Sequence, residues 1–236
     1  MYYLFIILSL TINEKLNRAT YLYENRHEME NYLEECKLLI EEVLNEDKEN
    51  EEALWNLSKI YYTLGDRTTS KEEKFKFYEK GMNLAERLIK INKENPEGHF
   101  WFGVNFGRIG QLKGVMKSLS SVPTIRKEFE TTLKLNPEHT GAMDGLAVLY
   151  YELPGLFGGN LNKSFEFLHK AMEIDSNYSI LYIDFAKVYA KKKNYEKAKE
   201  YLRKMLKLEN PTHQADFILK DEPEAKKLLA EIGGKQ

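Results

Sequence analysis

The histidines and carboxylates of this sequence form no pattern that is typical of a metal or catalytic site. The five histidines are scattered, and no two of them stand three or four residues apart. Neither His-Glu-x-x-His nor Cys-x-x-Cys occurs, and the single cysteine, Cys36, cannot form an internal disulfide. The Gly-x-Ser-x-Gly motif of serine hydrolases is absent too. We therefore expect no metal, no cofactor and no enzymatic activity, unless folding buries His99, Arg108 and Asp144 together and shifts their pKa values strongly.

Four glycines, at positions 103, 107, 110 and 114, stand three or four residues apart. They do not match the glycine-rich motifs that bind phosphate groups, and no strand is predicted before them. The spacing instead favours close packing of two helices, or a break in a helix near Gly110.

Other side chains are suited to binding, and they recur at matching positions of four similar segments. Each segment carries them near one face of a predicted helix, at intervals of about one turn. This set consists of Trp55, Lys59, Tyr62, Phe100, Val104, Arg108, Asp144, Val148, Tyr151, Ile183 and Lys187. The set can line a pocket for a partner helix or for a small apolar or amphipathic ligand, with Arg108 and Lys187 orienting an anionic group. The alternative, which we favour, is that these side chains are ordinary core.

The elements that carry these side chains are predicted to be paired helices. A large, a small and an aromatic residue recur with one spacing, as in Leu57-Ser58-Tyr61 and Phe185-Ala186-Tyr189. Each copy is followed by a second amphipathic helix that ends in Asn or Asp with proline or polar residues. This pattern is typical of tetratricopeptide repeats, in which two antiparallel helices form a unit of about 34 residues. We therefore predict an all-α fold, a right-handed tetratricopeptide-like solenoid of helical hairpins. It forms a single domain over residues 1–236, with about four and a half helix pairs and a C-terminal capping helix over residues 222–232.

Three insertions lengthen all repeats except the last. The extra residues, 67–77, 111–123 and 154–159, are predicted to lie between the paired helices, where they would enlarge one rim of the solenoid. In the last of these, PGLFGG, the glycines permit a tight turn around Phe157. For this loop we favour a connection in which Leu156 and Phe157 are tucked into the core over one that contacts a partner.

The first eleven residues contain the apolar run Tyr2–Leu10. This run is too short to span a bilayer, which takes about 20 residues. It is either the hydrophobic part of a secretion signal, which would place the protein outside the cytoplasm, or a helix docked on the next one, which fits a cytoplasmic protein. The residues leave both interpretations open.

Charge is balanced over the whole chain but uneven along it. The formal net charge is −2, which gives no reason to expect nucleic acid as a partner. Residues 24–52 hold twelve acidic and three basic side chains, a net of −9, whereas residues 187–207 hold nine basic and two acidic ones, a net of +7. Opposite charges at the two ends of a solenoid favour head-to-tail contact in a homo-oligomer or with a charged partner.

The central stretches, residues 107–139 and 149–178, resemble the T-component of tripartite ATP-independent periplasmic (TRAP) transporters. They are also similar to the regulator-of-microtubule-dynamics proteins. The resemblance covers roughly residues 50–232 and rests on Gly110, Gly114, Ile125, Pro137, Leu153-Pro154 and Gly158-Gly159. It implies an extracytoplasmic accessory protein, often oligomeric, that partners a substrate-binding transporter subunit and passes a ligand to it. The alternative is a general scaffold that binds a partner's helix or tail on its concave face.

Overall fold

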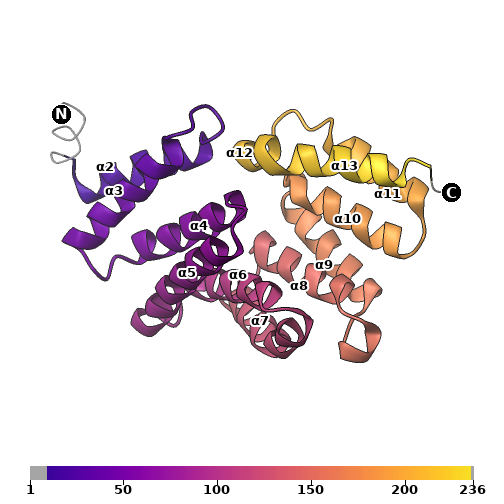
Figure 1. The fold of residues 1–236 in the computed structure, drawn as a ribbon, viewed down its shortest axis with the longest axis horizontal. Helices are drawn as coiled ribbons and strands as arrows, with labels where there is room; N and C mark the ends of the chain where they lie inside the picture. Colours follow the sequence, from indigo (N-terminus) through magenta and orange to yellow (C-terminus); the bar gives the residue numbers. More distant parts are fainter. Residues whose placement is uncertain (1–9, 235–236) are drawn as a thin grey trace. The chain divides into compact units, whose positions relative to one another are not determined.

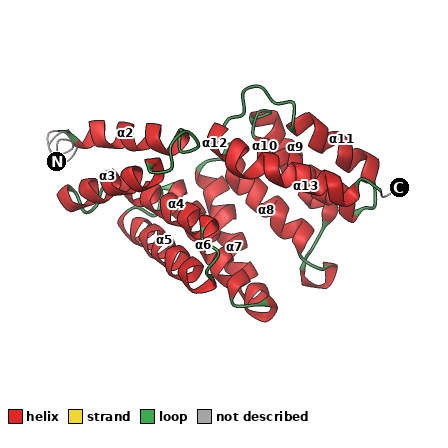
Figure 2. Cartoon of the chain, turned by 45° about the horizontal axis from the view of Figure 1, so that its top comes forward, coloured by secondary structure: helices red, strands yellow, loops and turns green. Residues whose placement is uncertain are grey.

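The computed structural model describes residues 10–234, without the side chains of residues 115–117. Over these residues the chain consists of helices joined by loops and contains no strand, which confirms the all-α prediction (Figure 1 and Figure 2). By its internal contacts the chain divides into two compact units, residues 1–135 and 136–236. The prediction of one continuous domain stays a prediction. Apart from Leu10, the apolar run at the start of the chain lies outside the described residues, and its interpretation stays open.

The first unit consists of three antiparallel helix pairs. Their bounds are α2 (Ile12–Glu24) and α3 (Tyr32–Glu46), α4 (Glu51–Arg67) and α5 (Lys71–Ile91), and α6 (Pro96–Leu112) and α7 (Val115–Leu135). Each helix packs on its pair mate, and α3 packs on α4 and α5 on α6, so that neighbouring pairs are stacked. This nearest-neighbour stacking is the arrangement of a repeat protein.

The second unit contains two further pairs and a C-terminal helix. Its elements are α8 (Thr140–Glu152), the 3₁₀ turn η1 (Gly155–Phe157), α9 (Leu161–Ile174), α10 (Ser179–Lys191), α11 (Tyr195–Met205), α12 (Gln214–Asp216), the π-helical turn η2 (Phe217–Asp221) and α13 (Glu222–Ile232). The range of α13 is the one predicted for the capping helix. It packs on α11, while η2 packs on α10. None of the described helices is long and apolar enough to cross a membrane.

The polar residues at the helix exits act as N-caps of the next helices. The side chains of Asn50, Ser70 and Asn95 each accept a hydrogen bond from a backbone N–H in the first turn of the following helix. Asn160 and Asn194 do the same for α9 and α11. Since such caps satisfy N–H groups that have no partner inside the helix, they explain why the repeating exits divide the chain into helices.

The first helix pair is complete, where the sequence had indicated only its second helix. Helix α2 begins at a capping box in which Thr11 accepts from the Glu14 backbone N–H and the Glu14 carboxylate accepts from the Thr11 backbone N–H. This signal is present in the sequence and was missed. The described residues therefore contain five pairs instead of four and a half.

Two of the three insertions lengthen helices instead of forming rim loops. Helices α4 and α6 have 17 residues and α5 and α7 have 21, whereas α8 to α11 have 11 to 14. Residues 67–77 are mostly the end of α4 and the start of α5, since Ser70 caps a sequence with good helix formers. The break after α6 falls at Gly114, whose φ is +94°, and not at Gly110.

The third insertion, residues 154–159, is a loop, but its apolar side chains are not in the core. Leu156 is 91% exposed and Phe157 is 50% exposed, so the predicted burial is wrong. The backbone N–H groups of Phe157 and Gly159 both donate to the carbonyl of Pro154, at 2.9 and 3.1 Å. Because the turn closes on its own backbone, the side chains between these residues point outward.

Close helix approach occurs at the small residues, as predicted. The Ser58 hydroxyl donates to the Gly81 carbonyl (2.8 Å), and the Asn105 amide donates to the Ser58 oxygen (3.2 Å), which joins α4, α5 and α6. A Cβ atom at Gly81 would lie 2.6 Å from Asn105 Oδ1, and one at Gly103 would lie 2.9 Å from the Phe129 ring. The fully buried Asn105 is thus held between two neighbouring helices.

Replacing Gly81 by alanine is expected to lower the free energy of unfolding by about 1–2 kcal/mol. The overpacking against Asn105 costs about 1–3 kcal/mol, and the better helix propensity of alanine offsets about 0.5–1 kcal/mol of it. Urea unfolding followed by circular dichroism measures the difference. The control is Gly155→Ala, where a Cβ atom meets nothing within 4 Å. Equal stability of the two variants would contradict the tight α5–α6 packing.

Candidate functional site

Four large aromatic side chains lie together on the first helices of the second and third pairs. The ring of Tyr62 on α4 lies 5.8 Å from that of Trp101 on α6, and Trp101 lies 5.0 Å from Phe100. Trp55 stands two turns before Tyr62 on α4. All four side chains are half-buried, so each keeps surface for a partner. Trp101 was missed in the sequence, although its position seven residues before Arg108 places both on one helix face.

Two cations are held against these rings. The Lys59 ammonium lies 4.0 Å from the centre of the Tyr23 ring and 5.1 Å from that of Trp55. Arg108 donates to the Tyr62 hydroxyl (2.9 Å), and its guanidinium lies 5.4 Å from the centre of the same ring. Cation–π contacts of this kind hold the two charged groups against the aromatic rings.

Arg108 is also fixed through a carboxylate. Asp66 lies 3.5 Å from the Arg108 guanidinium and accepts a 2.7 Å hydrogen bond from the Tyr78 hydroxyl of α5. The nearby oxygens of Tyr62 and Asp66 hold the pKa of Arg108 above its ordinary value, so it stays charged. The Arg108 side chain is still 35% exposed. Arg108 also donates to the Gln111 amide oxygen (3.3 Å), so three of its five N–H groups orient the guanidinium within the chain.

The structure thus brings together the predicted site residues of the first unit. Trp55, Lys59 and Tyr62 come from α4, and Phe100, Val104 and Arg108 come from α6; all are half-buried. We name these six residues with Trp101 the α4–α6 surface. Tyr23, which contributes a ring to Lys59, lies on α2, a helix that the sequence analysis did not predict.

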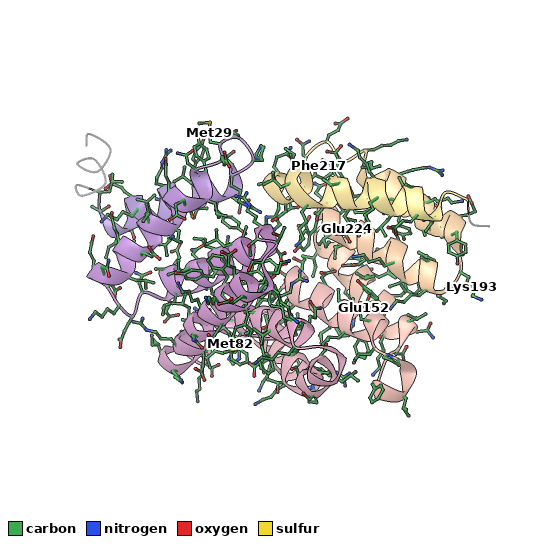
Figure 3. All side chains as sticks on the ribbon, viewed as in Figure 1. Met29, Met82, Glu152, Lys193, Phe217 and Glu224 are labelled. Atoms are coloured by element: carbon green, nitrogen blue, oxygen red, sulfur yellow. The ribbon has the colours of Figure 1, made fainter. Side chains whose placement is uncertain are left out.

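The predicted site residues of the second unit are largely taken up by internal contacts. Tyr151 and Ile183 are buried, and Ile183 packs in a cluster with Ala225 of α13. Lys187 pairs with Asp184 (3.3 Å) and with Glu224 of α13 (2.7 Å; Glu224 is labelled in Figure 3). Asp144 and Val148 are half-buried. The side chains of Tyr151 and Ile183 are thus placed as the alternative interpretation, ordinary core residues, expects.

Asp144 and Asp184 form a buried carboxyl pair in this second unit. Asp184 accepts a 2.8 Å hydrogen bond from the Tyr151 hydroxyl and lies beside Lys187, whereas Asp144 Oδ1 is buried with no hydrogen-bond partner. Burial and the neighbouring Asp184 raise the pKa of Asp144 well above its ordinary value. The neighbouring carboxylate thus favours the protonated form of Asp144. Burial also raises the pKa of the nearby Asp221, to about 6.

His99 and Arg108 lie on one helix but have different partners. His99 Nδ1 lies 2.6 Å from Glu128 Oε2, and Nε2 lies 3.0 Å from the Lys93 carbonyl. Because both neighbours accept, both ring nitrogens donate only in the charged imidazolium. The hydrogen bond to Glu128 accordingly raises the pKa of His99 above 6.5, against the effect of burial. The contacts of Asp144 named above belong to the second unit, whereas those of His99 and Arg108 belong to the first.

Replacing His99 by glutamine is expected to cost about 1 kcal/mol of stability below pH 6.5, where the imidazolium makes both hydrogen bonds. A group with a raised folded pKa stabilises below its unfolded pKa, and this contribution is lost as pH rises through the folded value. Urea unfolding of both proteins over pH measures the difference, and Glu128→Gln should remove the same pH dependence. An NMR titration that gives His99 a pKa of 6.5 or lower would contradict this assignment.

We next considered whether His, Cys, Asp and Glu side chains cluster as they would in a metal site. Over the part of the chain that the structure describes, no group of three or more His, Cys, Asp or Glu side chains is placed to bind an ion. The cysteine, Cys36 on α3, is buried, and burial raises the pKa of its thiol to about 12.

Comparison with models of known protein families assigns the chain to a family. The family model for regulator of microtubule dynamics protein 1-3 matches residues 16–157, more than half of the 236 residues. The chain belongs to this family. A tetratricopeptide repeat model matches residues 180–212. Both matches confirm resemblances noted in the sequence, whereas they give no support to the resemblance to the TRAP T-component.

Curated members of the regulator of microtubule dynamics family align with the chain at modest identity. Regulator of microtubule dynamics protein 3 of Bos taurus is 24% identical over 196 residues, which cover 75% of this chain and 41% of that protein. Regulator of microtubule dynamics protein 2 of Mus musculus is 29% identical over 132 residues, which cover 55% and 30%. The chain therefore spans less than half the length of these relatives.

Solved structures agree on the fold of this family member. A thermophilic tetratricopeptide repeat protein of Thermus thermophilus has a TM-score of 0.70 at 14% identity, and the match covers 91% of this chain and 98% of that one. A tetratricopeptide repeat protein from Parabacteroides merdae has a TM-score of 0.56 at 17% identity, covering 96% and 79%. At these identities the likeness shows the tetratricopeptide fold alone.

Proposed function

We propose that this chain is a non-catalytic protein-interaction scaffold that binds a partner segment on the α4–α6 surface. The tetratricopeptide fold and the family match support a scaffold in general. The observation that carries the proposal is the pair of cations, Lys59 and Arg108, held in place among half-buried Trp and Tyr side chains. Trp, Tyr and Arg are the residues that most often dominate binding energy at protein interfaces.

The chemistry of this surface specifies the partner segment. A carboxylate of the partner would accept hydrogen bonds from Arg108, whose guanidinium is already oriented by Tyr62 and Asp66. Apolar side chains next to that carboxylate would cover Phe100, Trp101 and Val104. The partner is therefore a segment with an acidic residue beside apolar ones. Because the relatives are named regulators of microtubule dynamics, tubulin is the first protein to test.

Tryptophan fluorescence tests this proposal directly. The chain has two tryptophans, Trp55 and Trp101, and both lie on the α4–α6 surface. Tryptophan-free peptides selected from a random library against the chain should carry an acidic residue beside apolar ones and should change this fluorescence on binding. Arg108→Gln is expected to weaken their binding by roughly tenfold, the loss of about 1.4 kcal/mol. Purified tubulin should compete with the selected peptide.

The matched control is Arg203→Gln, which removes an exposed arginine of α11. It is expected to leave the affinity unchanged. Selected peptides that bind wild type and Arg108→Gln equally, without a change in tryptophan fluorescence, would refute the α4–α6 surface as the binding site.

A small ligand with an apolar body, predicted from the sequence, would use the same aromatic side chains. Native mass spectrometry of the protein purified gently from its source tests this: a retained small molecule supports the ligand, and its loss in Trp101→Ala would place it here. The ligand-relay role of a transporter subunit depended on the TRAP resemblance and gains nothing from the family match.

A further inference from the structure

The loop between α8 and α9 presents two apolar side chains to solvent. Leu156 and Phe157, which we name the knob, are 91% and 50% exposed. The segment that carries them projects beyond the ends of the neighbouring helices α8 and α9 (Figure 2). An apolar side chain that keeps nine-tenths of its surface in water gains nothing from folding, so its surroundings decide what it can bind.

The knob is held in one conformation from both sides. Gly158 has a φ of +90°, and a Cβ atom at Gly159 would lie 1.8 Å from the Leu153 carbonyl oxygen, so both positions need glycine. The backbone N–H of Asn160 donates to the Tyr150 carbonyl (2.8 Å), and the Asn160 side chain caps α9. A fixed knob loses little conformational entropy on binding.

Three lysines lie near the helix ends that carry the knob, against one carboxylate, that of Glu152. The Lys191 ammonium donates to the Tyr151 carbonyl (2.5 Å) and lies 3.5 Å from Glu152, at the end of α8. The ammonium of Lys163 lies 5.3 Å from the centre of the Tyr150 ring, and that of Lys192 lies 5.3 Å from the centre of the Phe165 ring. The adjacent Lys193 extends away from the helices (Figure 3). The knob is thus an apolar projection with a basic rim.

The first unit carries a surface that complements the knob, because an exposed apolar side chain has acidic neighbours there. Leu38 on α3 is 47% exposed. Glu34, Glu35, Glu41 and Glu42 stand three or four residues from it, so on a helix they adjoin its side chain. Glu34 pairs with Lys37 and Glu42 with Lys15, so that four carboxylates face two ammonium groups and the surface stays acidic. We name Leu38 and these four glutamates the α3 patch. It lies within the stretch 24–52, whose net charge is −9. The α3 patch is thus an apolar centre with an acidic rim.

We propose that the knob of one chain docks on the α3 patch of a second copy of this chain. Leu156 and Phe157 would cover Leu38, and the lysines around the knob would face the glutamates of α3. Charge complementarity selects this occupant, because both surfaces belong to one sequence and carry opposite net charge. The contact joins two different surfaces, so it is heterologous and leads to a ring or an open chain of copies. It does not use the α4–α6 surface.

Sedimentation velocity of the whole chain over a range of concentrations tests the proposal. Wild type is expected to associate, and high salt should weaken the association, since the rims are exposed charges. Leu156→Ser with Phe157→Ser, and separately Leu38→Ser, should each weaken association by roughly tenfold or more. The matched control, Ile174→Ser, removes a 44% exposed side chain of α9 and should change nothing. Circular dichroism checks that all variants are folded.

Mixing the two defective variants is the decisive step. The Leu38→Ser chain keeps its knob and the Leu156→Ser, Phe157→Ser chain keeps its α3 patch, so the mixture should form one-to-one dimers that neither variant forms alone. A wild type that stays monomeric at all concentrations overturns the proposal, as does a mixture that stays monomeric. If the monomeric wild type instead cosediments with vesicles of anionic phospholipid, and the Leu156→Ser, Phe157→Ser chain does not, the knob binds membranes and not a second copy.

Discussion

Replacing Asp184 by alanine is expected to lower the free energy of unfolding by about 1–3 kcal/mol, because the buried Tyr151 hydroxyl loses its acceptor while Lys187 keeps its ion pair with Glu224. Asp184 is 2% exposed. It accepts from the Tyr151 hydroxyl and balances the charge of Lys187. Without it, the buried hydroxyl of Tyr151 loses its acceptor, and α8 and α10 lose one of the polar contacts that join them.

Urea unfolding at neutral pH measures this effect. The control is Glu173→Ala on α9, which removes an exposed carboxylate and should change the free energy of unfolding by less than about 0.5 kcal/mol. A loss at Asp184 no larger than at Glu173 would show that the carboxylate is not bound by Tyr151 and Lys187 in solution.

Asp144→Asn is expected to act in the opposite direction and to stabilise the protein increasingly as pH rises from 4 to 8. The unfolded carboxyl group loses its proton near pH 4, whereas burial beside Asp184 raises the folded pKa of Asp144 well above that. Between the unfolded and the folded pKa of Asp144, the folded state therefore binds more protons than the unfolded state. The stability of the folded state falls as pH rises through this range. An asparagine amide carries its donor hydrogens at every pH, so its hydrogen bond to Asp184 does not depend on protonation.

Unfolding of wild type and Asp144→Asn from pH 4 to pH 8 measures both parts of this prediction. The difference in stability between the two proteins should grow with pH. Asp221, whose pKa is raised to about 6, contributes a falling stability up to that pH in both proteins and cancels in the comparison. A variant that is less stable than wild type at pH 8 would contradict a proton shared in the Asp144–Asp184 pair.

The sequence could reveal what depends on local pattern. Residues such as Leu57, Ser58 and Tyr61 recur with helical spacing, and the exits carry capping side chains, so the paired helices and their small-residue contacts followed from neighbouring positions alone. The helical spacing also placed Lys59 and Arg108 near aromatic residues, because each cation shares a face of its own helix with aromatic side chains.

What the sequence did not reveal depends on distant contacts or on the backbone path. Asp144 and Asp184 are 40 positions apart, and only the packing of α8 on α10 makes them a pair. Ile183 is buried in a cluster that includes Ala225 of α13, 42 positions further along the chain, and no local pattern specifies that contact. Leu156 and Phe157 were expected in the core because they are apolar, yet the hydrogen bonds to the Pro154 carbonyl turn them outward.

The rate at which the buried thiol of Cys36 is chemically modified measures how often the α2–α3 hairpin opens. A thiol reacts as the thiolate, which a pKa of about 12 makes scarce at neutral pH, and α2, α3 and α4 surround it with apolar side chains. Modification by a disulfide reagent therefore requires the hairpin to separate from the rest of the first unit. Because the chain has one cysteine, each modified molecule records one such local opening, and the labelling rate reports how often this hairpin opens.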